Sequence, residues 1–458
     1  MPADPIEHVV VLMLENHSFD QMLGGMRTEL PDLDGVNPAA PHSNLDPDGG
    51  APYLQATTTA TSVAPDPMHE TKNVLVQLKD NNGNFVCDYA AKYPQTTRPQ
   101  RQQIMGYYAA GHLTSLHELA RHFTVCDHWY SSVPGPTWTN RFFVHSGTSL
   151  GRVIMPSGLD HPSLYFGYDQ DTVYDRLNER GISWKVYYGD IPHTLVLTHQ
   201  RRLSNARRHH RMSAFFSDAA GPDARFPAYC FIEPKYFPPG QNDDHPPHPT
   251  ARAQQLMADV YNTLRSNEAL WQKTLLVVLY DEHGGFFDHV APPAAVPPDV
   301  HVEEYSFDRF GVRVPAVLVS PWVDQGVLST EFDHTSLLKY LSDKWGLAPL
   351  TARVSAAKSI AEAIRTTGTA RDDTPPPLAA PEPVLEFAAA QVAVAEPAEA
   401  LNEHQQALLA FTDLLENEIQ EPASVKTFRH LAMKAKSTLT RVEAAKGRVD
   451  AFLAQRQP

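Results

Sequence analysis

Cysteine is scarce in this chain, and that scarcity excludes some classes of protein. Cys87, Cys126 and Cys230 are widely spaced and odd in number among 458 residues. Small secreted domains that rely on disulfides carry dense, even sets of cysteines, and zinc sites carry closely spaced pairs. The pattern therefore indicates a reduced compartment, without a disulfide framework or a cysteine-based metal site.

Long apolar runs and a surplus of positive charge are also absent. No run approaches the ~20 apolar residues of a membrane-spanning helix. The formal net charge is -15, whereas proteins that bind nucleic acid present a basic surface to the phosphate backbone. We therefore expect no transmembrane segment and no nucleic-acid partner.

The first residues, M-P-A-D-P-I-E, lack the basic start and the long apolar stretch of a signal peptide. We expect a cytoplasmic protein, or a secreted one if the chain is a processed form.

Two unbroken apolar runs, His8–Leu14 and Leu275–Tyr280, each end directly in an acidic loop. The loops read E-N-H-S-F-D from Glu15 and D-E-H-G-G-F-F-D-H from Asp281. Such runs suit strands buried on both faces of a parallel sheet, and open α/β sheets bind ligands beyond the carboxyl ends of their strands. We therefore expect both loops to bring oxygen ligands, suited to a divalent cation, to one crevice.

Further strands and helices alternate along the chain, which predicts an α/β fold. The predicted strands are 123–130, 183–188, 229–232 and 312–319, and the predicted helices are 105–120, 172–180, 251–266 and 335–345. Residues 21–70 are rich in Pro, Gly, Asn, Asp and Thr, which predicts an extended loop or lid.

The composition changes near residue 368, so we divide the chain into a main domain (1–368), a Pro/Ala-rich linker or wrapping segment (369–400) and a C-terminal helical hairpin (401–458). Apolar residues lie at helical spacing in both halves of this hairpin, around a break at residues 421–424. The hairpin either packs on the same core as the main domain or forms a contact with a partner, such as a second copy of the chain.

Candidate metal ligands follow the two apolar runs: Glu15, Asn16, Asp281 and Glu282. Loop acids and helix caps are the alternative interpretation. Consecutive residues of an extended chain point in opposite directions, so both members of a pair can bind one ion only where the backbone bends. The following pair, Gly284-Gly285, permits close approach of the backbone to something bound.

A turn at residues 131–141, S-S-V-P-G-P-T-W-T-N-R, precedes a segment with helical character. A hydroxyl at this position is either a helix cap or a nucleophile activated by a nearby cation. The residue pattern alone does not rank Thr137 above Thr139.

Three of the 22 histidines lie in loops that suit a role with phosphate, namely His69, His245 and His334. They are suited to donate to phosphate oxygens or to protonate a leaving oxygen. Surface and capping roles are the alternative, most clearly for His334, which precedes a helix. A basic run at residues 201–211 is either a solvated face or a surface that attracts anions.

Four ordered motifs resemble the bacterial phosphoesterase family, which contains non-haemolytic phospholipase C and an acid phosphatase and belongs to the alkaline-phosphatase superfamily. The motifs are E-N-H-S-F-D, P-G-P-T-x-x-N-R, D-E-H-G-G-F-F-D-H-V-x-P-P and D-H-T-S-L-L-K-Y-L. The resemblance covers roughly residues 5–350. It implies an alkaline-phosphatase-like, mostly parallel central sheet flanked by helices, and makes residues 1–368 a phosphoesterase catalytic domain.

The resemblance also implies one divalent metal ion (Ca, Mg, Mn or Zn) and assigns residues to it. Glu15, Asn16, Asp281 and Glu282 match the ligands, and Thr137 matches a nucleophile that also contacts the metal. His69, His245 and His334 match residues that contact or protonate the substrate, and His193 is a further candidate.

These assignments predict a metal-dependent, phospholipase C-like phosphoric-ester hydrolase that acts through a phospho-threonine intermediate. The substrate would be a phosphate ester, such as the phosphate ester that carries a phospholipid head group. One alternative is an acid phosphatase that acts on small phosphomonoesters. Another is a non-catalytic binding protein that uses the C-terminal helices. Those helices depart from the family, whose phospholipases often carry β-rich C-terminal modules.

Overall fold

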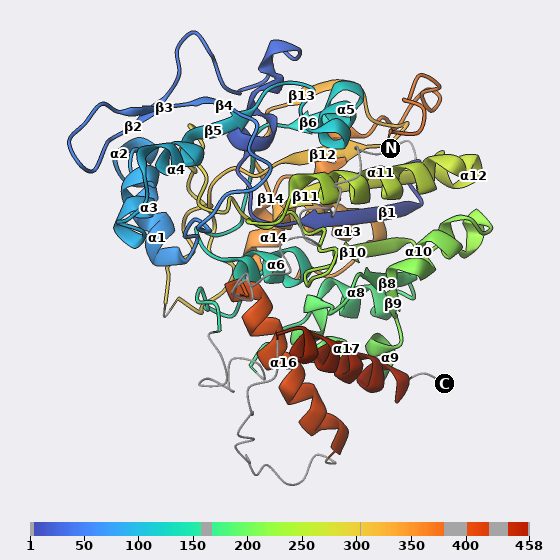
Figure 1. Ribbon diagram of the computed structural model, residues 1–458. Helices are drawn as coiled ribbons and strands as arrows, with labels where there is room; N and C mark the ends of the chain where they lie inside the picture. Colours follow the sequence, from blue (N-terminus) through green and yellow to red (C-terminus); the bar gives the residue numbers. More distant parts are fainter. Residues whose placement is uncertain (1–3, 157–166, 303, 380–400, 421–437, 457–458) are drawn as a thin grey trace.

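A computed structural model describes residues 4–156, 167–302, 304–379, 401–420 and 438–456, with the side chains of 416–420 and 438–439 left aside. Figure 1 shows a central sheet flanked by helices, with the last two helices against one side. The helices are α1 Thr71–Gln77, α2 Lys79–Asn82, α3 Phe85–Lys92, α4 Arg98–Gln102, α5 Thr114–His122, α6 Thr137–Ser146, α8 Val173–Glu179, α9 Leu203–Ala206, α10 Met212–Ala219, α11 Thr250–Ser266, α12 Glu268–Trp271, α13 His334–Trp345, α14 Ala352–Ala356, α16 Glu403–Gln420 and α17 Thr438–Ala454.

The central sheet has eight strands in the order β13-β6-β12-β11-β1-β10-β8-β9. All neighbours are parallel except for β12, which runs antiparallel to β11 and β6. The predicted mostly parallel sheet is thus confirmed. The strands are β1 His8–Leu14, β6 Thr124–Cys126, β8 Trp184–Tyr188, β9 His209–Arg211, β10 Tyr229–Glu233, β11 Thr274–Tyr280, β12 Ala316–Val319 and β13 Gly326–Leu328.

The two apolar runs form the centre of this sheet. Strands β1 and β11 lie side by side, in parallel, with Leu14 opposite Tyr280. Every residue of both strands is buried, as expected for strands covered by helices on both faces. The loops that follow them therefore leave the same edge of the sheet at neighbouring positions.

Two predictions of local structure are wrong. The predicted helix at 105–120 begins only at Thr114, because Gly106–Tyr108 forms a short strand, β5, that pairs with β4 Ala56–Thr58. Gly111 then adopts a left-handed conformation with φ 84°. The predicted strand at 123–130 is two strands in different sheets, β6 and β7 Trp129–Tyr130, the second paired with β14 Phe332–Asp333. Long-range pairing outweighs local preference in both cases.

Residues 21–70 contain little regular structure, in agreement with the loop prediction. Short elements interrupt the loop: the end of a π-helix (Asp20–Gly24), a 3-10 turn (Met26–Thr28), the paired strands β2 Ser43–Asn44 and β3 Tyr53–Leu54, and β4. A role for the segment as a lid stays a prediction.

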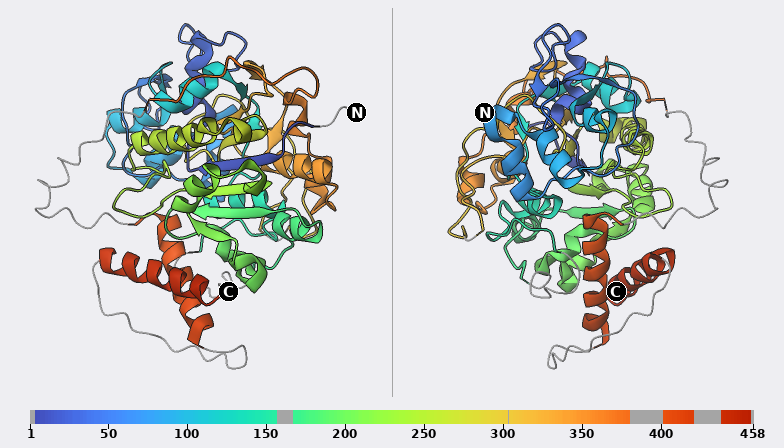
Figure 2. Two further views of the ribbon diagram at one scale, coloured as in Figure 1. Left: turned by 90° about the vertical axis from the view of Figure 1, so that its right-hand side faces the viewer. Right: turned by 60° about the vertical axis from the view of Figure 1, so that its left-hand side comes forward.

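The C-terminal helices α16 and α17 pack against each other and on the main domain (Figure 2). Their buried apolar residues share one cluster with side chains of the main domain, namely Leu408, Phe411, Leu415, Val442, Val449 and Phe452 with Trp138, Phe142, Tyr188 and Leu195. The predicted break at 421–424 lies outside the described residues. The proposed domain boundaries, and oligomer formation through these helices, stay predictions.

The basic run at 201–211 contacts the C-terminal helices. Arg207 donates to the carbonyl oxygen of Arg456, and Arg211 pairs with Asp450 of α17. Arg201 is buried and donates to the carbonyl oxygens of residues 195 and 196. Part of the positive charge of this run thus makes contacts within the molecule, with α17 and the residues just after it. None of the described helices combines the length and the apolar character needed to cross a membrane.

Candidate active site

The two acidic loops meet at one point beyond the sheet. Because β1 and β11 are adjacent and in register, Glu15 and Asp281 are the next residues of neighbouring strands. The backbone N–H of Asn16 donates to Asp281 Oδ1 at 3.2 Å, and the N–H of His17 donates to the Glu282 carbonyl oxygen at 3.0 Å. The expectation that both loops reach one crevice is therefore consistent with the geometry.

Arg141 joins the two acidic loops directly. Its Nη2 lies 3.1 Å from Glu15 Oε1, and its Nε donates to Asp281 Oδ2 at 2.9 Å. All three side chains are fully buried. Arg141 stands four residues after Thr137 on α6, so the two side chains share one face of that helix.

The backbone bends where the ligand pairs need it. Asn16 adopts a left-handed conformation with φ 61°, which turns its side chain away from the direction that an extended strand would give it. Gly284 has φ 64°, and a Cβ atom there would lie 2.1 Å from the Asn16 carbonyl oxygen. The close approach predicted for Gly284-Gly285 is therefore an approach to the protein's own chain, to Asn16 at Gly284 and to Pro67 and Met68 at Gly285.

Thr137, and not Thr139, faces the acidic loops. The Thr137 hydroxyl is buried at the start of α6 and donates to Asn16 Oδ1 at 3.3 Å. The Thr139 hydroxyl donates instead to the carbonyl oxygen of Arg152. The local pattern left these two threonines unranked, and the structure places only Thr137 beside a candidate metal ligand.

His69 and His245 lie together near these residues. Asn16 Nδ2 lies 3.4 Å from His69 Nε2, and the His69 and His245 rings are 5.7 Å apart in an edge-to-face arrangement. His69 Nδ1 is held by the carbonyl oxygen of Pro67 at 3.0 Å, which leaves Nε2 on the side of the site. Burial lowers the pKa of His245 well below its ordinary value.

His334 lies behind Asp281, and both of its ring nitrogens are engaged. Nε2 is 2.7 Å from the Asp281 carbonyl oxygen, and the Trp129 indole N–H donates to Nδ1 at 3.3 Å. Burial lowers its pKa to about 4. This geometry suits a residue that holds the Asp281 loop in place and leaves no nitrogen to contact a substrate.

The buried carboxylates of the site fit a divalent cation. Burial raises the pKa of Glu15, Asp281 and Glu282, in the last case to about 8. Within the described part of the chain, Glu282 Oε1, Asp243 Oδ2 and both Glu15 oxygens accept no hydrogen bond, although Glu15 Oε1 lies within ion-pair distance of Arg141. Arg141 pairs with Glu15 and Asp281, and hard oxygen ligands of this kind suit Ca, Mg or Mn. The donor set therefore fits the metal that the resemblance implies.

A second acidic group nearby is already neutralised by protein charges. Ligand atoms of Asp20, Asp288 and His289 lie within 4.8 Å of one another. Arg313 contacts both carboxylates, Asp20 at 3.1 Å and Asp288 at 2.8 Å. The Arg313 guanidinium thus supplies positive charge to both carboxylates, and we interpret these residues as a buried ion-pair network that joins the loops after β1 and β11.

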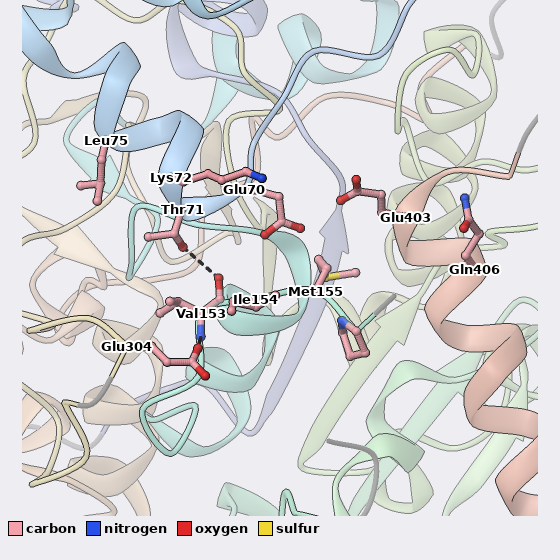
Figure 3. Close-up of a pocket in the computed structure, with 11 residues that line it drawn as sticks. Glu70, Thr71, Lys72, Leu75, Val153, Ile154, Met155, Glu304, Glu403 and Gln406 are labelled. Atoms are coloured by element: carbon pink, nitrogen blue, oxygen red, sulfur yellow. Dashed lines mark hydrogen bonds between the residues drawn. The ribbon is translucent and has the colours of Figure 1, made fainter. Parts of the chain in front are cut away.

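A cavity of about 550 Å³ opens between the segment that begins α1 and the first turn of α16 (Figure 3). Glu70 and Thr71 line one side of it, whereas Glu403 and Gln406 project from α16 on the other. The remaining lining residues are mainly apolar: Leu75, Val153, Ile154, Met155 and Pro156, with Lys72 and Glu304. Since Glu70 follows His69 and Glu403 precedes His404, the cavity is adjacent to the candidate site.

Three buried residues near the site were not identified from the sequence. Arg141 stands inside a recognised motif, and Asp243 lies two residues before His245 and accepts from His248 at 2.6 Å. For Arg141 and Asp243, a position inside or beside a recognised motif could have indicated a functional role. His404 lies on α16, 3.5 Å from Glu15 Oε1, and no local signal marks it. His193, the further candidate, stands buried between Trp138 and His404, with ring centroids 5.2 and 5.7 Å away.

Sequence comparison relates this chain to phospholipases. The Phosphoesterase family matches residues 6–348. Non-specific phospholipase C3 of Arabidopsis thaliana is 34% identical over 370 residues, which cover 73% of this chain and 68% of that protein. Non-specific phospholipase C6 of the same plant is 34% identical over 401 residues, covering 81% and 74%. Phospholipase C A of Mycobacterium tuberculosis is 31% identical over 394 residues, covering 75% and 73%.

Solved structures give weaker matches. A protein of the alkaline phosphatase superfamily from Vibrio parahaemolyticus is 11% identical, with a TM-score of 0.33, and the match covers 57% of this chain and 65% of that one. Similarity at this level supports no inference about chemistry. The sequence relatives do, and they exclude the non-catalytic alternative: the chain belongs to the phosphoesterase family and is a hydrolase that acts on phosphoric ester bonds.

Proposed function

We propose that this chain is a metal-dependent hydrolase of phospholipase C type that cleaves phosphodiesters through a phospho-threonine intermediate. The observation that carries the proposal is the hydrogen bond from Thr137 to Asn16 at 3.3 Å, beside buried carboxylates with unsatisfied oxygens. The similarity to plant and mycobacterial phospholipases C supports the choice of a diester substrate.

Glu15, Asn16, Asp281 and Glu282, with the Thr137 hydroxyl, would hold one divalent cation. The cation would lower the pKa of this hydroxyl and neutralise charge on the phosphoryl oxygens. Thr137 Oγ1 would then attack phosphorus, the bond to the leaving alcohol would break, and the phosphoryl group would remain on the threonine.

His69 and His245 would contact the phosphoryl group and transfer protons. His69 Nε2 is placed to contact a phosphoryl oxygen. His245 is suited to accept a proton, because burial keeps its ring neutral in the free protein. It would take up the proton that the Thr137 hydroxyl releases and pass it to the leaving alcohol. In the second step it would take a proton from the attacking water and return it to the threonine oxygen as the bond to phosphorus breaks. We assign His334 to positioning Asp281, in place of a direct role with the substrate.

The test compares Thr137→Ala with Thr139→Ala on p-nitrophenyl phosphorylcholine. Loss of the nucleophile should lower kcat by several orders of magnitude, as removal of nucleophiles does in other enzymes. Thr139→Ala is the matched control, since its hydroxyl donates to the Arg152 carbonyl oxygen and not to a candidate metal ligand among the described residues. It should stay within a few-fold of the wild type. The nucleophile assignment would be wrong if Thr137→Ala kept most of the activity and Thr139→Ala lost it.

A phosphatase acting on small monoesters is the nearest competing function. The cavity lined by Glu70 and Glu403, with its apolar wall, leaves room for the second ester group that a diester carries and a monoester lacks. We therefore expect faster turnover of p-nitrophenyl phosphorylcholine than of p-nitrophenyl phosphate. The opposite preference would favour the phosphatase and leave the nucleophile assignment intact.

A further inference from the structure

Helix α16 reaches the candidate site although the sequence separates them by more than a hundred residues. His404, in the first turn of this helix, is 1% exposed. Its Nε2 lies 3.5 Å from Glu15 Oε1. The neighbouring residues Glu403 and Gln406 line the cavity beside the site (Figure 3).

The first turn of α16 is fixed in place by specific contacts. The side chain of Gln405 donates to the Tyr236 carbonyl oxygen at 2.6 Å, and both residues are buried. The His404 ring packs edge-on against the Tyr236 ring with centroids 4.6 Å apart. Leu408 and Phe411, one and two turns further on, enter the apolar cluster around Trp138. The position of His404 is therefore fixed by the Tyr236 ring and by the packing of the helix that carries it.

The hydrogen bond from Trp138 sets the protonation of His404. An indole N–H can only donate, and it lies 3.1 Å from His404 Nδ1. Nδ1 must then be the acceptor nitrogen, so the ring is neutral and carries its proton on Nε2. Nε2 lies 3.5 Å from Glu15 Oε1, and among the described residues neither Nε2 nor the two Glu15 oxygens make a hydrogen bond.

We propose that His404 is a positioning residue for Glu15 and that helix α16 is thereby part of the active site. The inference rests on the proposed function, in which Glu15 is a metal ligand. Carboxylates that bind metals are oriented by hydrogen bonds from a second layer of residues, and losing such a bond weakens metal affinity about 10–100-fold. Trp138, next to the nucleophile Thr137, orients His404, and His404 orients Glu15.

The experiment titrates metal-stripped, full-length protein with Mn²⁺ by isothermal titration calorimetry. His404→Leu removes the N–H and should raise the Kd for Mn²⁺ about 10–100-fold. His404→Gln keeps an N–H at the position of Nε2 and should restore affinity to within a few-fold. At saturating Mn²⁺, the KM of His404→Leu for p-nitrophenyl phosphorylcholine should be unchanged, because the residue acts through Glu15 and not on the substrate.

His117→Leu is the matched control. His117 is an equally buried histidine on α5, bonded to the Met22 carbonyl oxygen and to the N–H of Gly111. It has no role in the proposed site, so its loss should leave the Kd for Mn²⁺ unchanged. If His404→Leu fails to fold, His404→Asn and His404→Gln decide the same point, because only glutamine reaches the Nε2 position.

The possible failures are distinguishable. If the wild type binds Mn²⁺ and His404→Leu binds it equally well, the inference about His404 is overturned while the proposed function stands. Equal affinities of the Asn and Gln variants would overturn it in the same way. If the wild type binds no divalent cation, the metal-dependent function itself is overturned, and the role of His404 with it.

Discussion

Arg141 neutralises part of the negative charge that is buried in this site. It lies between Glu15 and Asp281, and all three groups are removed from water. A charge buried without a partner is far more costly than an exposed one. The guanidinium group therefore makes it possible for two neighbouring strands to end in carboxylates at the same point.

Replacing Arg141 with methionine should destabilise the metal-free protein by about 3–5 kcal/mol, because it leaves two buried carboxylates unpaired. Lys339→Met is the control, since it breaks an exposed pair with Asp343 on α13 and should cost less than about 1 kcal/mol. Urea unfolding of both variants measures the difference. A similar small effect for both would mean that Arg141 does not neutralise the site.

Single residues also mark the limit of sequence-based prediction. Glu15 and Asp281 were identified because each follows a buried apolar run, and that signal is local. The role of His404 depends on a contact between segments far apart in the chain, which no local pattern encodes. Thr137 could be separated from Thr139 only through the family resemblance, and the hydrogen bond to Asn16 agrees with that choice.

At the scale of elements, the loops after β1 and β11 are matched to each other. Gly284 stands with φ 64° against the Asn16 carbonyl oxygen, where a Cβ atom would lie 2.1 Å away. Since a side chain there would clash with backbone, the two loops can meet only if this position is glycine.

Gly284→Ala should therefore push the two loops apart, costing about 2–4 kcal/mol in the free energy of unfolding and most of the activity. Gly181→Ala is the matched control: its φ is +67°, but nothing lies within 4 Å of its Cβ position, so only the conformational cost of about 1 kcal/mol remains. Urea unfolding and kcat on p-nitrophenyl phosphorylcholine are the measurements. Equal stability losses in both variants would contradict the account.

His289 joins three loops through its ring. Burial alone would lower its pKa, but hydrogen bonds to Asp20 and Asp34 outweigh burial and raise the pKa to about 10. A pKa raised in the folded state stabilises the protein fully below the unfolded value of about 6.5 and loses that contribution as the pH rises towards 10.

The wild type should therefore lose free energy of unfolding between pH 7 and pH 10, by up to roughly 3–5 kcal/mol. His289→Gln should be less stable at pH 7 and show a flatter profile over that range. Urea unfolding as a function of pH tests this prediction, and parallel profiles for the two proteins would refute it.

Elements with an unbroken burial pattern were the most predictable. The strands β1 and β11 agree with their predicted ranges to within one residue, and the helices α8, α11 and α13 do so closely. The segment 105–120 has helical spacing, but its first residues form the strand β5 because they pair with β4. Pairing partners of this kind are tertiary information.

At the scale of the whole molecule, the C-terminal helices and the sheet share one site. Helix α16 contributes His404 and two residues that line the cavity. Arg211 pairs with Asp450 of α17, and Arg207 donates to the Arg456 carbonyl oxygen just after this helix. The sequence predicted two amphipathic helices that pack on the core of the main domain or on a partner, and their apolar residues do share a cluster with the main domain. The contacts of Arg207 and Arg211 were not predicted, because a basic run has the composition of a solvated surface.

Metal binding should stabilise the whole molecule. A ligand that binds only the folded state at 100 times its Kd adds about 2.7 kcal/mol to the free energy of unfolding. We expect this gain from Mn²⁺ in the wild type and its loss in Asp281→Asn. Thermal unfolding with and without Mn²⁺ measures both, and an equal gain in the variant would place the metal elsewhere.

The most direct measurement locates the phosphoryl group during turnover. The wild type is mixed with p-nitrophenyl phosphorylcholine, quenched in acid within the first turnover and analysed by peptide mass spectrometry. We predict phosphorylcholine on the peptide that contains Thr137, and none in Thr137→Ala. The group attached to another residue, or no covalent adduct during rapid turnover, would contradict the account.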